Sequence, residues 1–221
     1  QLVAQYEAGM MMYIGDVPLS ARTNATIQKN VEVSSYSMST SAVYLNEKAM
    51  IADGSETGSA LFSNPKVRQA LSLAVDRAAL AEMAVYADAA TGLVPTGVWE
   101  TGANRNKSFR SACDAYYECL KHDLEKAKSL LTEAGIKPEQ YSFSLTVSGY
   151  DDVQNALAEK ILEAWNALGF KVTLRVRGTI LNNDYYKYTA SVPTDMCDDL
   201  YAEALRSTDY EAILFLSLIH I

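Results

Sequence analysis

The segment 141–176 constrains the fold more than any other, because the spacing of its hydrophobic residues changes twice. Residues 141–148 alternate hydrophobic and polar side chains, which predicts a strand with one packed face. Residues 153–168 then place hydrophobic side chains at helical spacing up to Gly169, and residues 170–176 alternate again. This order predicts a β-α-β unit, which in nearly all proteins is right-handed with parallel strands. The chain is therefore expected to be an α/β protein.

The ends of these two predicted strands are the first candidates for a ligand site. In open α/β sheets, ligands gather outside the carboxyl ends of the strands. One strand runs into SGYD (148–151) and the other into RGT (177–179). Gly149 has a plainer alternative role, since it could simply make the turn. We predict ligand contacts from five residues of these stretches: Ser148, Gly149, Tyr150, Arg177 and Thr179.

A second clear pattern lies in NPKVRQALSLAVDRAAL, residues 64–80. Asn64 is a good N-cap, and Pro65 fits the first helical position, where its missing N–H costs nothing. The hydrophobic residues that follow have the spacing of a helix packed on a core. Asp76 favours a cap over a helix interior, so a bend and a second helix are expected there. Arg68 lies two turns before Asp76, too far for direct contact along the helix, and we favour a structural role that anchors the helix to neighbouring loops.

The remaining segments carry shorter patterns. Asp123 is expected to cap an amphipathic helix that ends at Gly135. Residues 88–119 bear glycines and lack periodicity, which predicts a long surface loop. Further elements are expected as follows: a short helix at 2–9, a strand at 10–14, a helix at 18–29, strands at 31–33, 42–46 and 210–214, and a helix around 200–205.

Composition argues against several classes of function. The formal net charge of −8 over 221 residues, with scattered Lys and Arg, disfavours nucleic acid as a partner. The longest apolar run, 212–221, falls short of the roughly 20 residues that a membrane-spanning helix needs. The sequence has no GxSxG, HExxH, Walker A or GxGxxG motif, and His122 has no nucleophile motif nearby. We therefore expect neither an enzyme nor a cofactor.

The three cysteines, Cys113, Cys119 and Cys197, leave two interpretations open. They lack the paired CxxC spacing of a zinc site, so no metal centre is expected. If the protein is exported, Cys113 and Cys119 could close a small disulfide loop, and Cys197 would stay unpaired or bond outside this chain. Reduced, buried thiols are the other interpretation.

Five stretches of the sequence have the order and spacing of one protein family. They are NPKVRQALSLAVDRAAL, LVAQYEAGMMMYIGDVP (2–18), VYLNEKAM (43–50), HDLEKAKSLLTEAGI (122–136) and ALGFKVTLRV (167–176). They resemble, in turn, the vRqAl..AiDr, sGe.D, yl.fN, dpekAk.LLaeAG and iGi.v.l segments of the family 5 extracellular solute-binding proteins. This family includes the oligopeptide, dipeptide and nickel receptors of ABC importers. The resemblance covers nearly the whole chain to Leu214.

The resemblance implies a type II periplasmic-binding-protein-like α/β fold, in which two lobes close over a ligand. This chain would supply mainly the second lobe and be incomplete at both ends. Residues 1–46 would form the end of the first lobe and the crossover segment, and residues 47–215 the second lobe. Residues 216–221, LSLIHI, read like the translation of a transposon end used as a sequencing adapter, so we expect a non-native tail; a genuine buried strand is the alternative.

The resemblance also implies a function. The chain would belong to the substrate-binding component of an ABC importer, which captures oligopeptides noncovalently and delivers them to permease subunits in the membrane. Such a protein would be an extracytoplasmic monomer, periplasmic or lipid-anchored, with any leader upstream of residue 1. The family's layout adds Tyr44 and Asn46, near the crossover strand, to the predicted ligand contacts, although Asn46 could only tie down a loop. The family's acidic residue for a peptide ammonium group lies beyond the fDm strand, here 209–211, so we expect weak peptide binding or none from this chain.

Three alternatives stay open. The same lobe architecture occurs in solute-sensing domains of regulators, where it is fused to DNA-binding regions. Nickel or haem could replace peptide as the ligand, although a chain with 2 histidines and 14 tyrosines favours peptide. A small α/β enzyme of unknown type is disfavoured by the absent nucleophile and metal motifs.

Overall fold

The computed structural model describes most of the chain. The described residues are 2–15, 17–31, 39–95, 98–102, 105–109, 121–148, 151–177, 204 and 207–218, with the backbone alone for 215–218. Helices and strands follow in this order: α1 Leu2–Glu7, η1 Leu19–Ala21, α2 Ala25–Asn30, β1 Ser39–Leu45, η2 Leu61–Ser63, α3 Pro65–Leu73, α4 Arg77–Ala84, α5 Leu124–Glu133, η7 Pro138–Gln140, β2 Ser142–Ser148, α6 Asp152–Ala167, β3 Lys171–Arg177 and β4 Ala212–Leu218.

The predicted β-α-β unit is confirmed. Strands β2 and β3 are parallel and pair from Ser142↔Lys171 to Ser148↔Arg177, and α6 connects them. Gly169, just after α6, has a φ of 105°, a conformation that glycine adopts without steric cost. It ends the helix at the position that the sequence predicts.

The sheet has four strands in the order β1-β4-β2-β3. Strand β4 is parallel to β2, whereas β1 is antiparallel to β4. The carboxyl ends of β2, β3 and β4 therefore lie at one end of the sheet, which we call the carboxyl edge. The amino end of β1 lies at the same edge.

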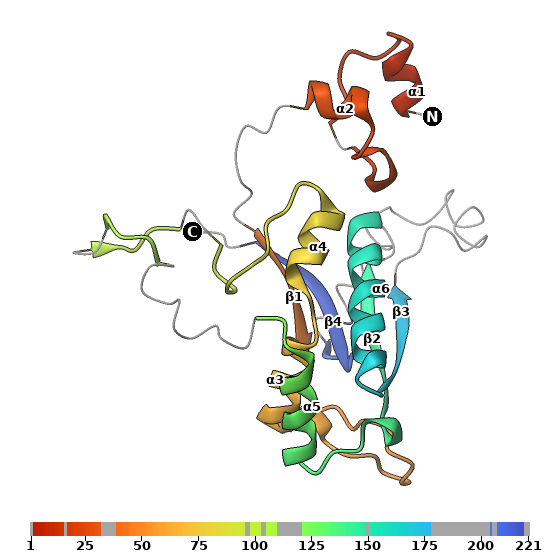
Figure 1. Cartoon of the computed structure of the whole chain (residues 1–221), viewed down its shortest axis with the longest axis vertical. Coiled ribbons are helices and arrows are strands. Elements are labelled where there is room, and N and C mark those ends of the chain that lie inside the picture. The colour runs from red at the N-terminus through yellow and green to blue at the C-terminus, as the bar shows by residue number, and fades with distance from the viewer. Residues whose placement is uncertain are drawn as a thin grey trace.

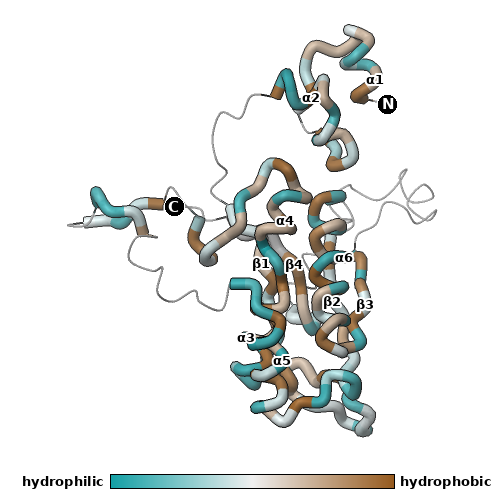
Figure 2. The backbone as a smooth tube through the Cα atoms, viewed as in Figure 1, coloured by the Kyte–Doolittle hydropathy of each residue, from teal (hydrophilic) through white to brown (hydrophobic). Residues whose placement is uncertain are grey.

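One face of the sheet packs against the helices and forms the hydrophobic core. Figure 1 shows α6 in front of β2, with α3 and α5 toward the lower end of the sheet, and Figure 2 shows hydrophobic residues along the strands. The ring centroid of Phe143 lies 5.0, 5.8 and 5.6 Å from those of Phe62, Trp165 and Phe170. Edge-to-face and tilted contacts of this kind stabilise a core beyond their buried area. The most buried core residues are Ile51, Phe62, Val67, Ala70, Leu71, Ala127, Leu145, Val147, Ala158 and Ala212.

Side-chain caps begin three helices where the sequence predicts them. Asn64, Asp76 and Asp123 each accept hydrogen bonds from backbone N–H groups of the following turn, at 2.9 to 3.1 Å. They begin α3, α4 and α5, respectively. Each cap satisfies an N–H that has no partner within its helix. The expected bend at Asp76 is therefore confirmed.

Arg68 has the structural role expected from its place in α3. Its Nη1 donates to the backbone oxygens of Phe62 at 2.6 Å and Ser63 at 3.1 Å, and it lies 2.9 Å from Oε1 of Glu47. Arg68 thus joins α3 to the turn before it and to the loop after β1.

Two predictions in the amino-terminal part are wrong. Residues 10–14 form no strand; the side chain of Met12 is 98% exposed, so no packed face supports one. The helix predicted at 18–29 is split into η1 and α2, because Asn24 caps α2 and accepts hydrogen bonds from its first turn at 2.8 and 3.2 Å. Asparagine favours caps over helix interiors. Val31 is not in a strand, and the rest of the strand predicted at 31–33 lies outside the described residues.

Strands β1 and β4 are longer than predicted. They pair along their whole length, from Ser39↔Leu218 to Leu45↔Ala212. This pairing extends β1 into the Ser-rich stretch and carries β4 past residue 214. The backbone of residues 216–218 is therefore part of a strand, and the expectation of a non-native tail stays a prediction.

Other predictions concern parts of the chain with little regular structure. The described parts of 88–119 contain no α-helix and no strand beyond a bridge between Trp99 and Ser108, as expected for a loop. Cys113, Cys119 and Cys197 lie outside the described residues. Of the helix expected around 200–205, the described residue Ala204 is helical and buried. Within the described ranges, we find no helix with the length and apolar character to cross a membrane.

Candidate functional site

The carboxyl edge of the sheet holds two of the predicted ligand contacts. Ser148 ends β2 and Arg177 ends β3, and the two residues are directly opposite each other. Opposite residues in a sheet share a face, and here it is the face away from the hydrophobic core. Gly149, Tyr150 and Thr179 lie outside the described residues, so their contacts stay predictions.

A hydrogen-bond network holds the turn between β2 and α6. Oδ1 of Asp151 accepts from two backbone N–H groups of α6 at 3.0 Å, and its Oδ2 accepts from Nε2 of Gln154 at 2.9 Å. Nδ2 of Asn155 donates to the backbone oxygens of Ser148 at 3.1 Å and Asp151 at 2.7 Å. Asp151 is thus the N-cap of α6. A supported turn of this kind keeps the residues at the end of β2 in place.

Two arginines of β3 share one carboxylate, which comes from the segment just before β4. Nη2 of Arg175 and Nη2 of Arg177 donate to Oδ2 of Asp209, at 3.1 and 3.0 Å. The side chain of Arg177 is 25% exposed and that of Asp209 is 63% exposed. Two guanidinium groups face one carboxylate, so the cluster of Arg175, Arg177 and Asp209 has a net positive charge. Arginine binds carboxylates well, because its planar fork of N–H donors matches their geometry.

Some buried polar side-chain atoms near the carboxyl edge have no hydrogen-bond partner among the described residues. Within the part of the chain that the structure describes, they include Nε of Arg177, Oγ1 of Thr146 and Oε1 of Gln154. Thr146 is fully buried and shares a face with Ser148, two residues further along β2. Such unpaired groups are unfavourable and uncommon in folded proteins. One donor, one acceptor and one hydroxyl that can do either would all be satisfied by a polar ligand or by water.

Tyr44 lies within β1, the strand of the predicted crossover segment, whereas Asn46 follows the end of that strand. Tyr44 is opposite Ile213, which is in turn opposite Thr146, so Tyr44 lies in the row next to that of Ser148. Asn46 lies beyond the carboxyl end of β1, which is away from the carboxyl edge because β1 is antiparallel. Its Nδ2 donates to two backbone oxygens of the segment before β4, at 3.2 and 3.0 Å. Asn46 therefore ties down a loop, and a ligand contact from it stays a prediction.

Sequence reasoning missed three residues of this site: Thr146, Gln154 and Asp209. The sequence RVR (175–177) was a usable signal, because alternate residues of a strand share a face and bring two guanidinium groups together. No comparable signal exists for Asp209. Its contact with β3 depends on where the chain enters β4, which the local sequence does not determine.

Comparison with known proteins identifies the family. The family model of the bacterial extracellular solute-binding proteins, family 5 Middle, matches residues 1–205. The glutathione-binding protein GsiB of Salmonella typhi is 31% identical over 123 residues, which are 55% of this chain and 20% of GsiB. GsiB of Escherichia coli K12 is 35% identical over 104 residues, which are 46% of this chain and 17% of that protein. The chain thus spans at most 20% of the length of these curated relatives.

Solved structures show the same fold. Listeria monocytogenes OppA bound to peptide matches with a TM-score of 0.64 at 17% identity, over 97% of this chain and 37% of OppA. Helicobacter pylori DppA in complex with the peptide STSA matches with a TM-score of 0.62 at 17% identity, over 100% of this chain and 35% of DppA. Campylobacter jejuni NikZ in complex with Ni(L-His) matches with a TM-score of 0.52 at 18% identity, over 97% of this chain and 37% of NikZ.

These likenesses confirm the expected type II periplasmic-binding-protein architecture. The family model covers nearly the whole sequence, and it includes both the amino-terminal helices and the β-α-β unit. The chain therefore belongs to the bacterial extracellular solute-binding proteins of family 5.

Proposed function

We propose that this chain forms part of the substrate-binding component of an ABC importer and that its ligand is an oligopeptide. Family membership supports solute binding. Two structural neighbours hold peptides, and the curated relatives are named for glutathione, which is itself a modified tripeptide. The observation that carries the proposal is the face of β2 and β3 away from the core, where the buried Thr146 hydroxyl, unpartnered among the described residues, lies opposite Arg175 of the arginine pair.

The proposed peptide site is built around Arg177. Its Nη2 is bound to Asp209, but its Nε has no hydrogen-bond acceptor among the described residues, so the guanidinium can still take a carboxylate of the ligand. The hydroxyl of Ser148 lies opposite Arg177 and can bond a peptide backbone group. The remaining proposed contacts are Gly149, Tyr150, Thr179 and Tyr44, with Asn46 in a supporting place.

The proposed mechanism is closure of two lobes over an extended peptide. Backbone hydrogen bonds would give affinity, and open side-chain pockets would give breadth. Residues 1–46 would belong to the first lobe and crossover, and residues 47–215 to the second lobe. The protein would work outside the cytoplasm as a monomer that hands its ligand to a permease, without covalent chemistry.

A nickel complex is the second candidate ligand, because NikZ with Ni(L-His) shares the fold. Nickel favours imidazole ligands. Among the described residues, no three His, Cys, Asp or Glu side chains are grouped closely enough to hold a metal ion. Peptide is therefore the preferred ligand.

An NMR titration of the isotope-labelled chain with pentaalanine tests the proposal. The chain spans only part of its relatives, so we expect weak binding, with a Kd of about 1 mM. The backbone signals of Ser148 and Arg177 should shift, and Arg177→Ala should abolish the shifts. Arg105→Ala is the matched control, because Arg105 is exposed and belongs to no strand. If pentaalanine causes no shifts at about 20 mM but Ni(L-His) does, the nickel alternative replaces the peptide proposal.

A further inference from the structure

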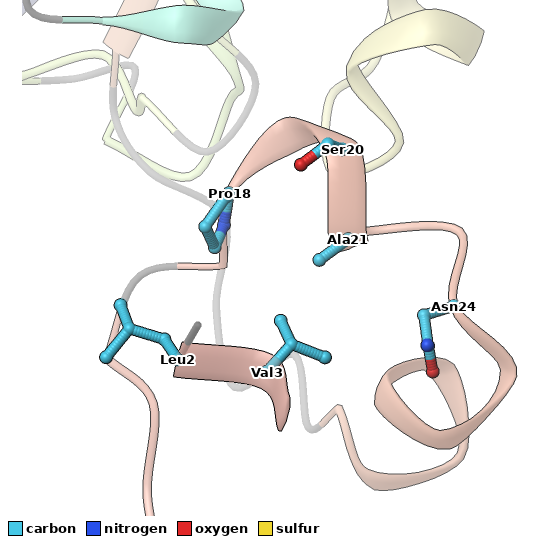
Figure 3. Close-up of a pocket in the computed structure, with 6 residues that line it drawn as sticks. All are labelled: Leu2, Val3, Pro18, Ser20, Ala21 and Asn24. Carbon is cyan, nitrogen blue, oxygen red and sulfur yellow. The ribbon is translucent and has the colours of Figure 1, made fainter. Parts of the chain in front are cut away.

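The N-terminal unit, which comprises residues 2–15 and 17–31, lies outside the hydrophobic core. Nδ2 of Asn24 donates to Oε1 of Glu7 at 3.2 Å and joins α2 to α1, and a cavity of about 490 Å³ remains between α1 and η1 (Figure 3). Among the described residues, the core that joins the sheet to its helices includes none from this unit. Figure 1 shows the unit beyond the upper ends of α4 and α6. Its placement therefore depends on contacts at its rim, and small polar interfaces between domains permit relative motion.

One rim contact joins η1 to the start of α6. The backbone N–H of Leu19 donates to Oδ2 of Asp152 at 2.9 Å. Leu19 begins η1, and Asp152 begins α6 just after the turn that leaves β2. This hydrogen bond therefore connects the N-terminal unit to the carboxyl edge, where the candidate ligand site lies.

The second rim contact joins Arg22 to the end of α4. Nη1 of Arg22 donates to the backbone oxygen of Ala84 at 2.8 Å, and the guanidinium carbon lies 5.2 Å from the ring centroid of Tyr86. Nε of Arg22 donates to the oxygen of Val17 at 3.0 Å, which fixes the direction of the group. Ala84 is the last residue of α4, and the carbonyl end of a helix attracts a cation. A cation over an aromatic ring adds to this attraction.

The turn that binds Arg22 has an unusual backbone. Val85 has a φ of 67°, which is rare for a β-branched residue. Its left-handed conformation follows the Ala84 carbonyl and precedes the Tyr86 ring, and both contact the same guanidinium. Strained residues of this kind persist where surrounding contacts hold them, often at clamps and switches. The strain at Val85 is thus spatially coupled to Arg22.

We infer that Arg22 and Asp152 form a latch that holds the N-terminal unit across the carboxyl edge in a closed arrangement. The latch consists of the Arg22 contacts with Ala84 and Tyr86 and the Leu19 contact with Asp152. It is polar and small, so it can open without disturbing the core. The interpretation of this arrangement as the closed state of a solute receptor rests on the proposed function, in which ligand would enter while the latch is open.

Hydrogen–deuterium exchange of the chain without ligand tests the latch. Arg22→Ala and Asp152→Ala are each expected to speed exchange in residues 17–30 about tenfold, because a hydrogen bond to a charged group is lost. Arg22→Lys keeps the charge but loses the planar fork, so it should fall between the natural chain and Arg22→Ala. Matched controls are Arg105→Ala and Glu56→Ala, which remove exposed charges elsewhere and should change nothing.

The exchange pattern decides whether the contacts act as a latch. Faster exchange confined to residues 17–30 and 84–86 supports it. Unchanged exchange in both alanine variants overturns it, and so does faster exchange throughout β2 and α6, because that would show ordinary structural packing. The measurement uses no ligand, so failure of the latch is distinguishable from failure of pentaalanine to bind.

Discussion

Nε1 of Trp165 donates a hydrogen bond to the backbone oxygen of Leu71 at 3.0 Å, inside the hydrophobic core. The bond joins α6 of the β-α-β unit to α3. It also satisfies a carbonyl in the last turn of α3, where carbonyl groups lack N–H donors within the helix. The β-α-β unit is thereby attached to α3.

Trp165→Phe is expected to lower the free energy of unfolding by about 2 to 3 kcal/mol, because it leaves the Leu71 oxygen buried without its partner and leaves space in the core. Urea unfolding followed by far-ultraviolet circular dichroism measures the change. Trp99→Phe is the control, since Trp99 is 59% exposed, and its effect should stay below about 0.5 kcal/mol. Equal effects of the two substitutions would contradict the role of the buried bond.

Thr146→Val and Ser144→Ala should have opposite effects on stability. The Thr146 hydroxyl is buried without a partner in the described structure, so valine of the same shape should leave stability unchanged or raise it by about 1 kcal/mol. Ser144 donates its hydroxyl to Oε2 of Glu211 at 2.7 Å, and its loss should cost about 1.5 kcal/mol or more. Both residues lie on one face of β2, so they form a matched pair. Destabilisation by Thr146→Val would show that the hydroxyl has a partner after all.

Asp209→Asn should separate stability from ligand binding. The carboxylate pairs with Arg175 and Arg177 but is 63% exposed, so its loss should cost less than about 1 kcal/mol of stability. The same change frees the guanidinium of Arg177, and NMR titration with pentaalanine should then show tighter binding. Acetylation of the peptide's amino group should not remove the gain, whereas amidation of its carboxyl group should. A gain that survives amidation would refute a carboxylate contact with Arg177.

Lys66→Met should raise the pKa of Glu133 toward its ordinary value. The hydrogen bond and charge of Lys66, 2.9 Å from Oε2, lower the pKa of Glu133 in the folded chain. A carboxyl group with a lowered pKa contributes stability above its unfolded pKa and loses it as pH falls through the folded pKa. The link between α3 and α5 should therefore weaken under acid conditions. An NMR pH titration of the Glu133 side chain checks this, with Lys128→Met as the control, since Lys128 pairs with Glu125 instead.

Features set by neighbouring residues were predictable from the sequence. The caps at Asn64, Asp76 and Asp123 were predicted, because each joins residues no more than three positions apart in the sequence. The β-α-β unit was predictable for the same reason, because each element has its own hydrophobic period. The strand expected at 10–14 failed, since a strand also needs a partner that the local sequence does not show.

Features that depend on distant parts of the chain were not predictable. No local pattern indicates that β4 lies between β1 and β2, and this placement decides both the burial of Thr146 and the position of Asn46. The pairing of the two β3 arginines could be predicted from their alternate positions in the strand. Their carboxylate partner Asp209 could not, because it comes from the segment before β4. The candidate site could therefore be located at the strand ends but not completed.

The central place of β4 has a consequence for the order of folding during synthesis. Among the described strands, β1 pairs with β4 alone, and more than half of the chain separates the two in sequence. As the protein emerges from the ribosome, β2, α6 and β3 can assemble while β1 still lacks its neighbour. Pairings between distant segments form slowly, because loop closure must come first. The sheet becomes continuous only when β4 inserts, so β1 stays without its strand partner until residues 212–218 have been synthesised.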